Sequence, residues 1–177
     1  MEKDFKEILS SEIFSLTGGL AVGTLLLYIS DKLWLLPGLF ILWPGLLDLN
    51  GDLSGSVAAR ISSALHLGTL DLNKKYEKHV VGNLIASFVL SIIMGFILGF
   101  IAFLSTLLFF HKNSPQIIFV GGISALCGAI LTIPVTITLS IMFYLRGNDP
   151  NNIMGPFMAT IGDVAGAIGL IFTLMII

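Results

Sequence analysis

Three aspartates in strongly apolar surroundings are the residues of this sequence best suited to chemistry. Asp163 lies inside the final apolar run, residues 153–177, and Asp48 and Asp52 lie in an earlier one. An ionised side chain at membrane depth is costly, so it usually marks an ion path, a proton relay or a buried partner. Carboxylate oxygens suit hard cations such as Mg²⁺ and Ca²⁺, whereas zinc and copper sites use imidazole and thiolate. Mg²⁺ fits a sparse acidic site with room for water, and composition alone fits Na⁺ or H⁺ almost as well.

Structural roles are open for the same residues. Asp163 could pair with Arg60 or His66 inside a helix bundle and fix the register of the helices. Asp48 and Asp52 could instead cap a helix that begins after a break in their apolar run.

The elements that would position these aspartates are membrane-spanning helices. Hydrophobic residues make up 55% of the 177 residues and charged residues 11%, whereas soluble domains carry about 25% charged residues. Five apolar runs are long enough to cross about 30 Å of hydrocarbon; they cover residues 13–29, 33–67, 80–110, 116–145 and 153–177. We therefore expect an all-α, polytopic membrane helix bundle with five transmembrane helices. It would form one domain at residues 13–177, preceded by a cytoplasmic amphipathic lead-in at residues 1–12.

The charges predict an orientation and argue against one class of partner. The net charge is only −2 and the basic residues are scattered, so we expect no nucleic-acid partner. With a cytoplasmic N-terminus, seven basic residues fall on or toward the cytoplasmic side: Lys3, Lys6, Arg60, Lys74, Lys75, Lys78 and Arg146. Lys32 and Lys112 fall on the other side. The positive-inside rule then predicts a multi-pass protein of the cell membrane with an extracellular C-terminus.

The second apolar run, residues 33–67, is too long for one straight span. Its 35 residues would form a helix of roughly 52 Å, so something must bend, tilt or protrude. The candidate breaks are Pro37, Pro44 and Gly51, and around Gly51 lies the polar string DLNGDLSGS at residues 48–56. Non-helical backbone and carboxylates at membrane depth are tolerated only beside protein or a water-filled cavity. We expect the string to line such a cavity.

Asp163 lies beside a stripe of small residues. If the last helix begins near Ile153, Asp163 is about 15 Å along it, near the bilayer midplane. Small residues recur every three or four positions around it, at Gly155, Ala159, Gly162, Gly166 and Gly169. Such a stripe lets another helix backbone approach closely, so we expect Asp163 to face a helix interface rather than lipid.

Two strings resemble signatures of the MgtE and solute carrier family 41 magnesium transporters. PGLLDLNGD at residues 44–52, followed by ARISSAL at residues 59–65 and by Gly68, is similar to the second-helix signature of that family. NDPNN at residues 148–152 resembles the beginning of its fifth-helix motif, which continues here with Pro156, Thr160, Asp163 and Gly166. In the number and order of spans, the resemblance covers essentially the whole chain.

The resemblance implies a five-helix protomer that dimerises, or is duplicated within one chain, around a central cation path, with Mg²⁺ as the transported ion. For this chain we expect a homodimer. Asp163 matches the magnesium-site aspartate of the fifth helix. Asp52 stands where the family usually has an asparagine that lines the path, so ion preference and affinity stay open. Asp48 and Asn50 would be secondary ligands or outer-shell groups. Thr160 and Asp149 of the fifth-helix motif join the candidate metal ligands.

Other classes of function are left as alternatives. A Na⁺- or H⁺-coupled exporter of another divalent ion would use the same carboxylates. A membrane enzyme of the CDP-alcohol phosphotransferase type is favoured less, because its signature needs Asp-Gly with Ala-Arg close behind. This chain has Gly51-Asp52 and a longer gap before Ala59-Arg60. A membrane scaffold without transport would tolerate loss of the acidic residues. We expect a transporter rather than an enzyme, with no catalytic residues.

Overall fold

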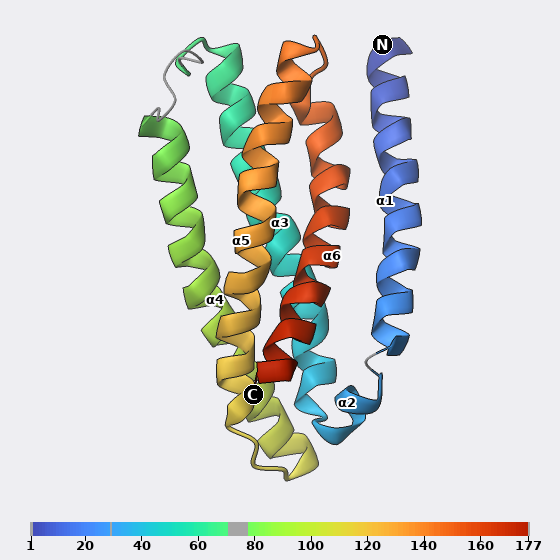
Figure 1. Ribbon diagram of the computed structural model, residues 1–177, viewed down its shortest axis with the longest axis vertical. Helices are drawn as coiled ribbons and strands as arrows, with labels where there is room; N and C mark the ends of the chain where they lie inside the picture. Colours follow the sequence, from blue (N-terminus) through green and yellow to red (C-terminus); the bar gives the residue numbers. More distant parts are fainter. Residues whose placement is uncertain (1, 29, 71–77, 177) are drawn as a thin grey trace.

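The protein is a bundle of long helices. The computed structural model describes residues 2–28, 30–70 and 78–176, and within these ranges every regular element is helical. The elements are α1 Glu2–Tyr28, α2 Ser30–Leu35, α3 Gly38–His66, α4 Lys78–Phe110, α5 Gln116–Leu145 and α6 Pro150–Ile176. The five long helices lie side by side and alternate in direction, which places the two termini at opposite ends of the bundle (Figure 1). The predicted all-α fold is confirmed.

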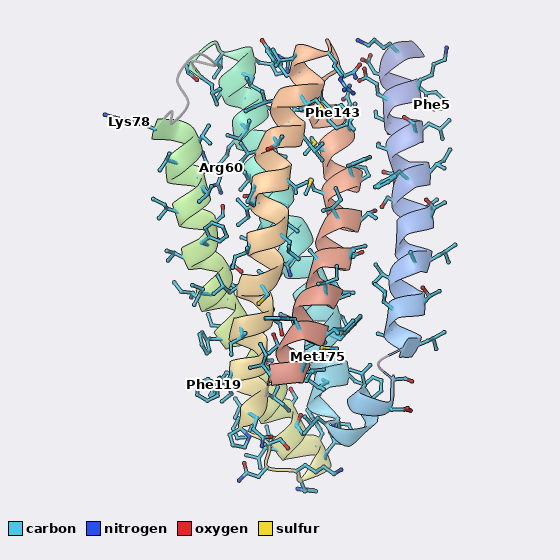
Figure 2. The ribbon with its side chains drawn as sticks, viewed as in Figure 1. Phe5, Arg60, Lys78, Phe119, Phe143 and Met175 are labelled. Carbon is cyan, nitrogen blue, oxygen red and sulfur yellow. The ribbon has the colours of Figure 1, made fainter. Side chains whose placement is uncertain are left out.

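Membrane-crossing helices make up most of the bundle. Four segments of the described chain are long and apolar enough to cross a membrane: Lys3–Leu27, Val80–Phe110, Gln116–Leu145 and Pro150–Ile176. The fifth long helix, α3, has 29 residues and is therefore about 43 Å long. It carries the polar string and packs against α4, α5 and α6. The outward-projecting Phe5 and Phe119 are more than half exposed, as expected of side chains that face lipid (Figure 2).

The second apolar run is divided at Pro37. α2 ends at Leu35 and α3 begins at Gly38, so one of the three candidate breaks is confirmed. The other two candidate breaks, Pro44 and Gly51, lie inside an uninterrupted α3, so the backbone around the polar string is helical. Continuous helix satisfies backbone groups within the segment, which is the dominant requirement in a membrane. The helical cost of glycine, about 1 kcal/mol, is offset because Gly51 lets the Ala159 backbone approach: a Cβ on Gly51 would lie 3.3 Å from Ala159 Cα.

Small residues bring α6 against α3 and α5. A Cβ added to Gly162 would lie 2.5 Å from the backbone nitrogen of Gly51, and one on Gly169 would lie 2.7 Å from the Ser124 carbonyl oxygen. The predicted interface is therefore confirmed for this part of the stripe. A Cβ on Gly155 would meet open space. The stripe thus divides into a part that packs against other helices and a part that leaves a surface open.

The helix α1 lies at the edge of the bundle, where it contacts α6 and α2. Phe14 stacks on Phe157 with ring centroids 4.0 Å apart, and Gly18 packs against the Thr160 side chain. Residues 2–12, most of the predicted lead-in, continue into the following apolar segment as a single helix.

Candidate cation site

The three aspartates highlighted by the sequence line one groove between α3 and α6. The groove has a volume of about 310 Å³. Its walls are formed by Leu47, Asp48, Gly51, Asp52, Gly55 and Ser56 of α3 and by Gly155, Ala159 and Asp163 of α6. The polar string therefore lines a cavity, as predicted, although it does so from a regular helix.

Helical periodicity explains how these side chains reach the same groove. Residues three or four positions apart share a helix face, which brings Asp48 and Asp52 together on α3. On α6, Gly155, Ala159 and Asp163 follow one another at intervals of four. Because the small residues fill little space between the helices, the carboxylates are left accessible. Gly155 and Ala159 were predicted only to pack against another helix, although their spacing from Asp163 already indicates that they share its face.

The groove is negatively charged. Asp48 and Asp52 are exposed and Asp163 is half-buried. Asp48 and Asp163 are near enough for their charges to repel each other. Within the described part of the chain, none of the three carboxylates forms a hydrogen bond or an ion pair. Charged groups in membrane helices are normally paired or face a water-filled cavity. These three carboxylates have no partner among the described residues and face the groove instead.

The two cationic partners considered for Asp163 are engaged elsewhere. Arg60 donates hydrogen bonds to Ser56 Oγ at 3.1 Å and to Asn83 Oδ1 at 3.2 Å. His66 Nε2 lies 3.3 Å from Asp149 Oδ1. Asp163 therefore does not form an ion pair with Arg60 or His66 that would fix the register of the helices.

The groove is an open arrangement of oxygen ligands rather than a closed metal cage. In residues 2–28, 30–70 and 78–176, no three His, Cys, Asp or Glu side chains lie close enough together to hold an ion. Carboxylates that are spread along a groove can hold a cation which keeps part of its water shell, as Mg²⁺ commonly does.

A comparison with protein-family models decides the family. Residues 43–173 match the MgtE model, described as a divalent cation transporter, and this range covers well over half of the chain. The chain belongs to the MgtE family of divalent cation transporters. It is therefore a multi-pass membrane transporter and not an enzyme, which sets aside the phosphotransferase alternative. Searches of curated proteins and of solved structures found no match.

The MgtE match contains the whole groove, whereas α1 and α2 lie outside it. It also contains the other three candidate ligands, Asn50, Thr160 and Asp149. The structure places none of these three on the groove wall.

Asn50 is buried on another side of α3, with 1% of its surface exposed. Its Nδ2 donates to the Leu46 carbonyl oxygen at 2.9 Å. Cβ atoms added to Gly128 of α5 and Gly166 of α6 would lie 2.6 and 3.2 Å from this nitrogen. The Asn50 side chain thus fills the contact between three helices of the MgtE domain, while its Oδ1 has no hydrogen bond among the described residues.

Thr160 faces α1 rather than the groove. Its hydroxyl donates to the Pro156 carbonyl oxygen at 3.3 Å, and its methyl group contacts Gly18. α6 therefore contacts α1 through Thr160 and borders the groove through Asp163.

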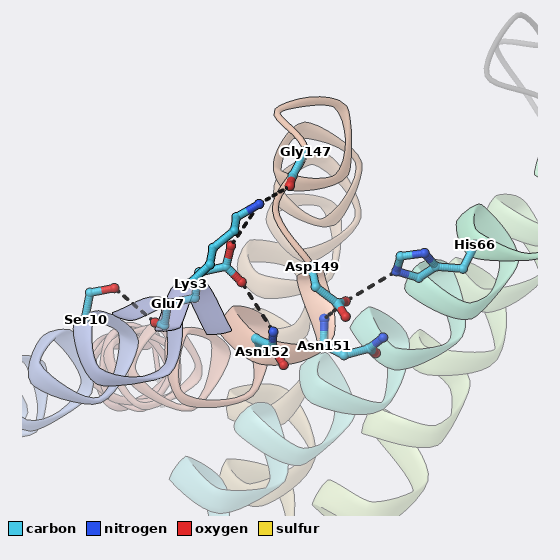
Figure 3. Close-up of polar contacts among 8 residues, drawn as sticks. All are labelled: Lys3, Glu7, Ser10, His66, Gly147, Asp149, Asn151 and Asn152. Atoms are coloured by element: carbon cyan, nitrogen blue, oxygen red, sulfur yellow. Dashed lines mark hydrogen bonds and ion pairs between the residues drawn. The ribbon is translucent and has the colours of Figure 1, made fainter. Parts of the chain in front are cut away.

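Asp149 lies at the end of the bundle, immediately before α6 (Figure 3). Its Oδ1 accepts a hydrogen bond from the Asn151 backbone at 2.9 Å and contacts His66 at the end of α3. This is the geometry of a helix N-cap, followed by proline at the first helical position. Asp149 therefore fixes the start of α6 and joins it to α3.

Proposed function

We propose that this MgtE-family chain transports Mg²⁺ and that the α3–α6 groove forms half of the ion path. The observation that carries the proposal is the set of three carboxylates that line one groove without a partner in the described chain. An all-oxygen ligand set favours a hard divalent cation, and an open groove leaves space for the water that Mg²⁺ retains.

A second copy of the chain would complete the path. One groove offers few ligands and no closed site among the described residues, whereas a two-fold axis would present each carboxylate twice. We assign Asp163 as the principal ligand, because it lies on α6 across the groove from the α3 acids. Asp48 and Asp52 would raise the local cation concentration and bind the hydrated ion.

The proposed orientation places the N-terminus in the cytoplasm and the C-terminus outside the cell. Lys3 and Arg146 lie at the end of the bundle that holds the N-terminus, and Lys112 lies in the turn at the opposite end. Lys74 and Lys75 fall outside the described residues. This charge asymmetry supports the orientation through the positive-inside rule. The first turns of α1, residues 2–12, would then lie at the cytoplasmic headgroup layer.

Ion flux in proteoliposomes tests the proposal. Mg²⁺, Ca²⁺, Mn²⁺ and Co²⁺ are compared with and without a sodium gradient, for the wild type, Asp163→Ala and the control Asp149→Ala. We expect Mg²⁺ flux in the wild type and in Asp149→Ala and its loss in Asp163→Ala. Unchanged flux in Asp163→Ala would show that the ion site is assigned wrongly. Flux that requires the sodium gradient would favour the coupled exporter instead.

A further inference from the structure

We propose that a second, apolar groove, between the start of α3 and the end of α4, binds an anionic phospholipid. The groove has a volume of about 560 Å³ and is lined by Pro37, Phe40, Ile41, Phe110 and Lys112. Four of these residues are apolar, and the fifth carries a positive charge. Acyl-chain carbons would pack against the apolar walls, and the lipid phosphate would contact the Lys112 ammonium group.

The groove lies where a lipid headgroup would be expected. The span Val80–Phe110 ends at this groove, and the polar residues 111–115 follow at once. Only 22% of the most apolar stretch of this span is buried inside the protein, so most of its surface is left to the hydrocarbon. A lipid could therefore enter from the bilayer along α4, and its headgroup would remain at the level of Lys112, which is in the outer leaflet in the orientation proposed above.

The chain holds Lys112 in position at the rim. His111 adopts a left-handed backbone conformation with φ of 52°, which is uncommon for a residue other than glycine. The Lys112 backbone N–H then donates to the Thr106 carbonyl oxygen at 3.4 Å. Thr106 is fully buried, and its hydroxyl donates to the Ala102 carbonyl oxygen at 2.7 Å. The lysine thus extends from a turn that is anchored to the buried side of α4.

The lining selects an amphiphile with a negative head. Among the described residues that line the groove, Lys112 is the only charged one, and no acidic side chain among them neutralises it. A small anion would gain nothing from walls of Phe40 and Ile41, and an uncharged apolar ligand would gain nothing from the ammonium group. A phospholipid with net negative charge would contact both the apolar walls and the ammonium group. A lysine side chain can place its ammonium group at the membrane surface while its methylene groups pack on apolar residues.

The proposal is independent of the cation path. Phe40 and Ile41 lie at the beginning of α3, before the first groove aspartate, Asp48. Variants of the apolar groove therefore leave the carboxylates in place, and the failure of one proposal would not affect the other.

Native mass spectrometry of the purified full chain tests the proposal. The protein is equilibrated with mixed phosphatidylglycerol and phosphatidylcholine in detergent, and the lipids retained are counted. The wild type should retain phosphatidylglycerol preferentially, and Lys112→Gln should lower that retention about fivefold. Ile41→Trp, which fills the groove without changing charge, should lower retention of both lipids. Lys78→Gln, which removes an exposed lysine at the other end of α4, is the control and should match the wild type.

Three results would overturn the proposal. The first is equal retention of the two lipids by the wild type together with no effect of Lys112→Gln. The second is complete displacement of phosphatidylglycerol by inorganic phosphate, which would indicate a free-anion site. The third is a change of oligomeric state in Ile41→Trp with unchanged lipid retention, which would indicate that a second copy of the chain occupies the groove.

Discussion

Asp149 and Asp163 belong to the same sequence motif, but one lies just before α6 and the other lies in its middle, and their surroundings differ. Asp149 lies at the end of the bundle, where it caps α6 and contacts His66 of α3. Asp163 lies within α6, in a groove shared with Asp48 and Asp52, and forms no hydrogen bond or ion pair with the described residues. The difference shows that one carboxylate is used to hold the fold and the other is left available for a ligand.

The free-energy cost of the two positions supports this distinction. An aspartate at the centre of a membrane helix costs about 2.5–3.5 kcal/mol, whereas an aspartate cap stabilises a helix by about 1 kcal/mol. A costly residue with no structural partner is expected where a cation or its water compensates the charge. If the groove is needed for transport and the bundle end for stability, variants of the two regions should change flux and stability separately.

Blocking the groove should have the largest effect. Gly155 lines the groove, and a Cβ there meets no atom within 4 Å, so the side chain of Gly155→Phe would begin in open space and extend into the groove. We expect Mg²⁺ flux in proteoliposomes to be nearly abolished. Gly19→Phe on α1, where a Cβ also meets open space, is the matched control and should retain flux. Equal flux in Gly155→Phe and Gly19→Phe would show that the groove is no more important for transport than the surface of α1.

Removing one α3 charge should have an intermediate effect. Asp52→Asn keeps the shape of the side chain and leaves Asp163 in place. Loss of about 1 kcal/mol of electrostatic attraction would raise the Mg²⁺ concentration for half-maximal flux about fivefold. Gly55→Ala changes a neutral residue of the same wall, where a Cβ meets no atom within 4 Å, and should leave this concentration unchanged. If Asp52→Asn behaves like Gly55→Ala, the α3 side of the groove does not contribute to ion binding.

A third variant separates packing from transport within the small-residue stripe. A Cβ on Gly162 would lie 2.5 Å from the Gly51 backbone nitrogen, so Gly162→Ala should force α3 and α6 apart. We expect this overpacking to lower the free energy of unfolding by about 1–3 kcal/mol. Thermal unfolding of the purified protein should show a lower midpoint for Gly162→Ala and little change for Gly155→Ala. Similar midpoints would mean that the two parts of the stripe do not differ as described.

Removing the cap should have the smallest effect. Asp149→Ala loses the hydrogen bond to the Asn151 backbone, which should destabilise the protein by about 1 kcal/mol. The contact with His66 is largely exposed and should add little. Flux per folded molecule should match the wild type. A loss of flux as large as that of Asp163→Ala would contradict the division between the two carboxylates.

The sequence predicted the helices and the groove acids because apolar run length and helical spacing are local properties. It failed at Pro44 and Gly51, where α3 continues without a break. Gly51 packs against the Ala159 backbone of α6, whereas Pro44 is exposed on the surface of α3. Asn50 could not be separated from Asp52 by type or motif, because only the position of α5 and α6 shows that Asn50 is buried between helices. Thr160 and Asp149 were likewise proposed from a resemblance that fixes sequence position but not the direction of a side chain.

Mn²⁺ binding, measured by electron paramagnetic resonance on the purified protein, tests the central claim most directly, because Mn²⁺ accepts the same oxygen ligands as Mg²⁺. If two grooves meet to form one site, the wild type should bind one tightly held ion per two chains, and excess Mg²⁺ should displace it. Asp163→Asn should lose this binding, and Asp149→Asn should keep it. One ion per chain, or unchanged binding in Asp163→Asn, would contradict a shared site built on Asp163.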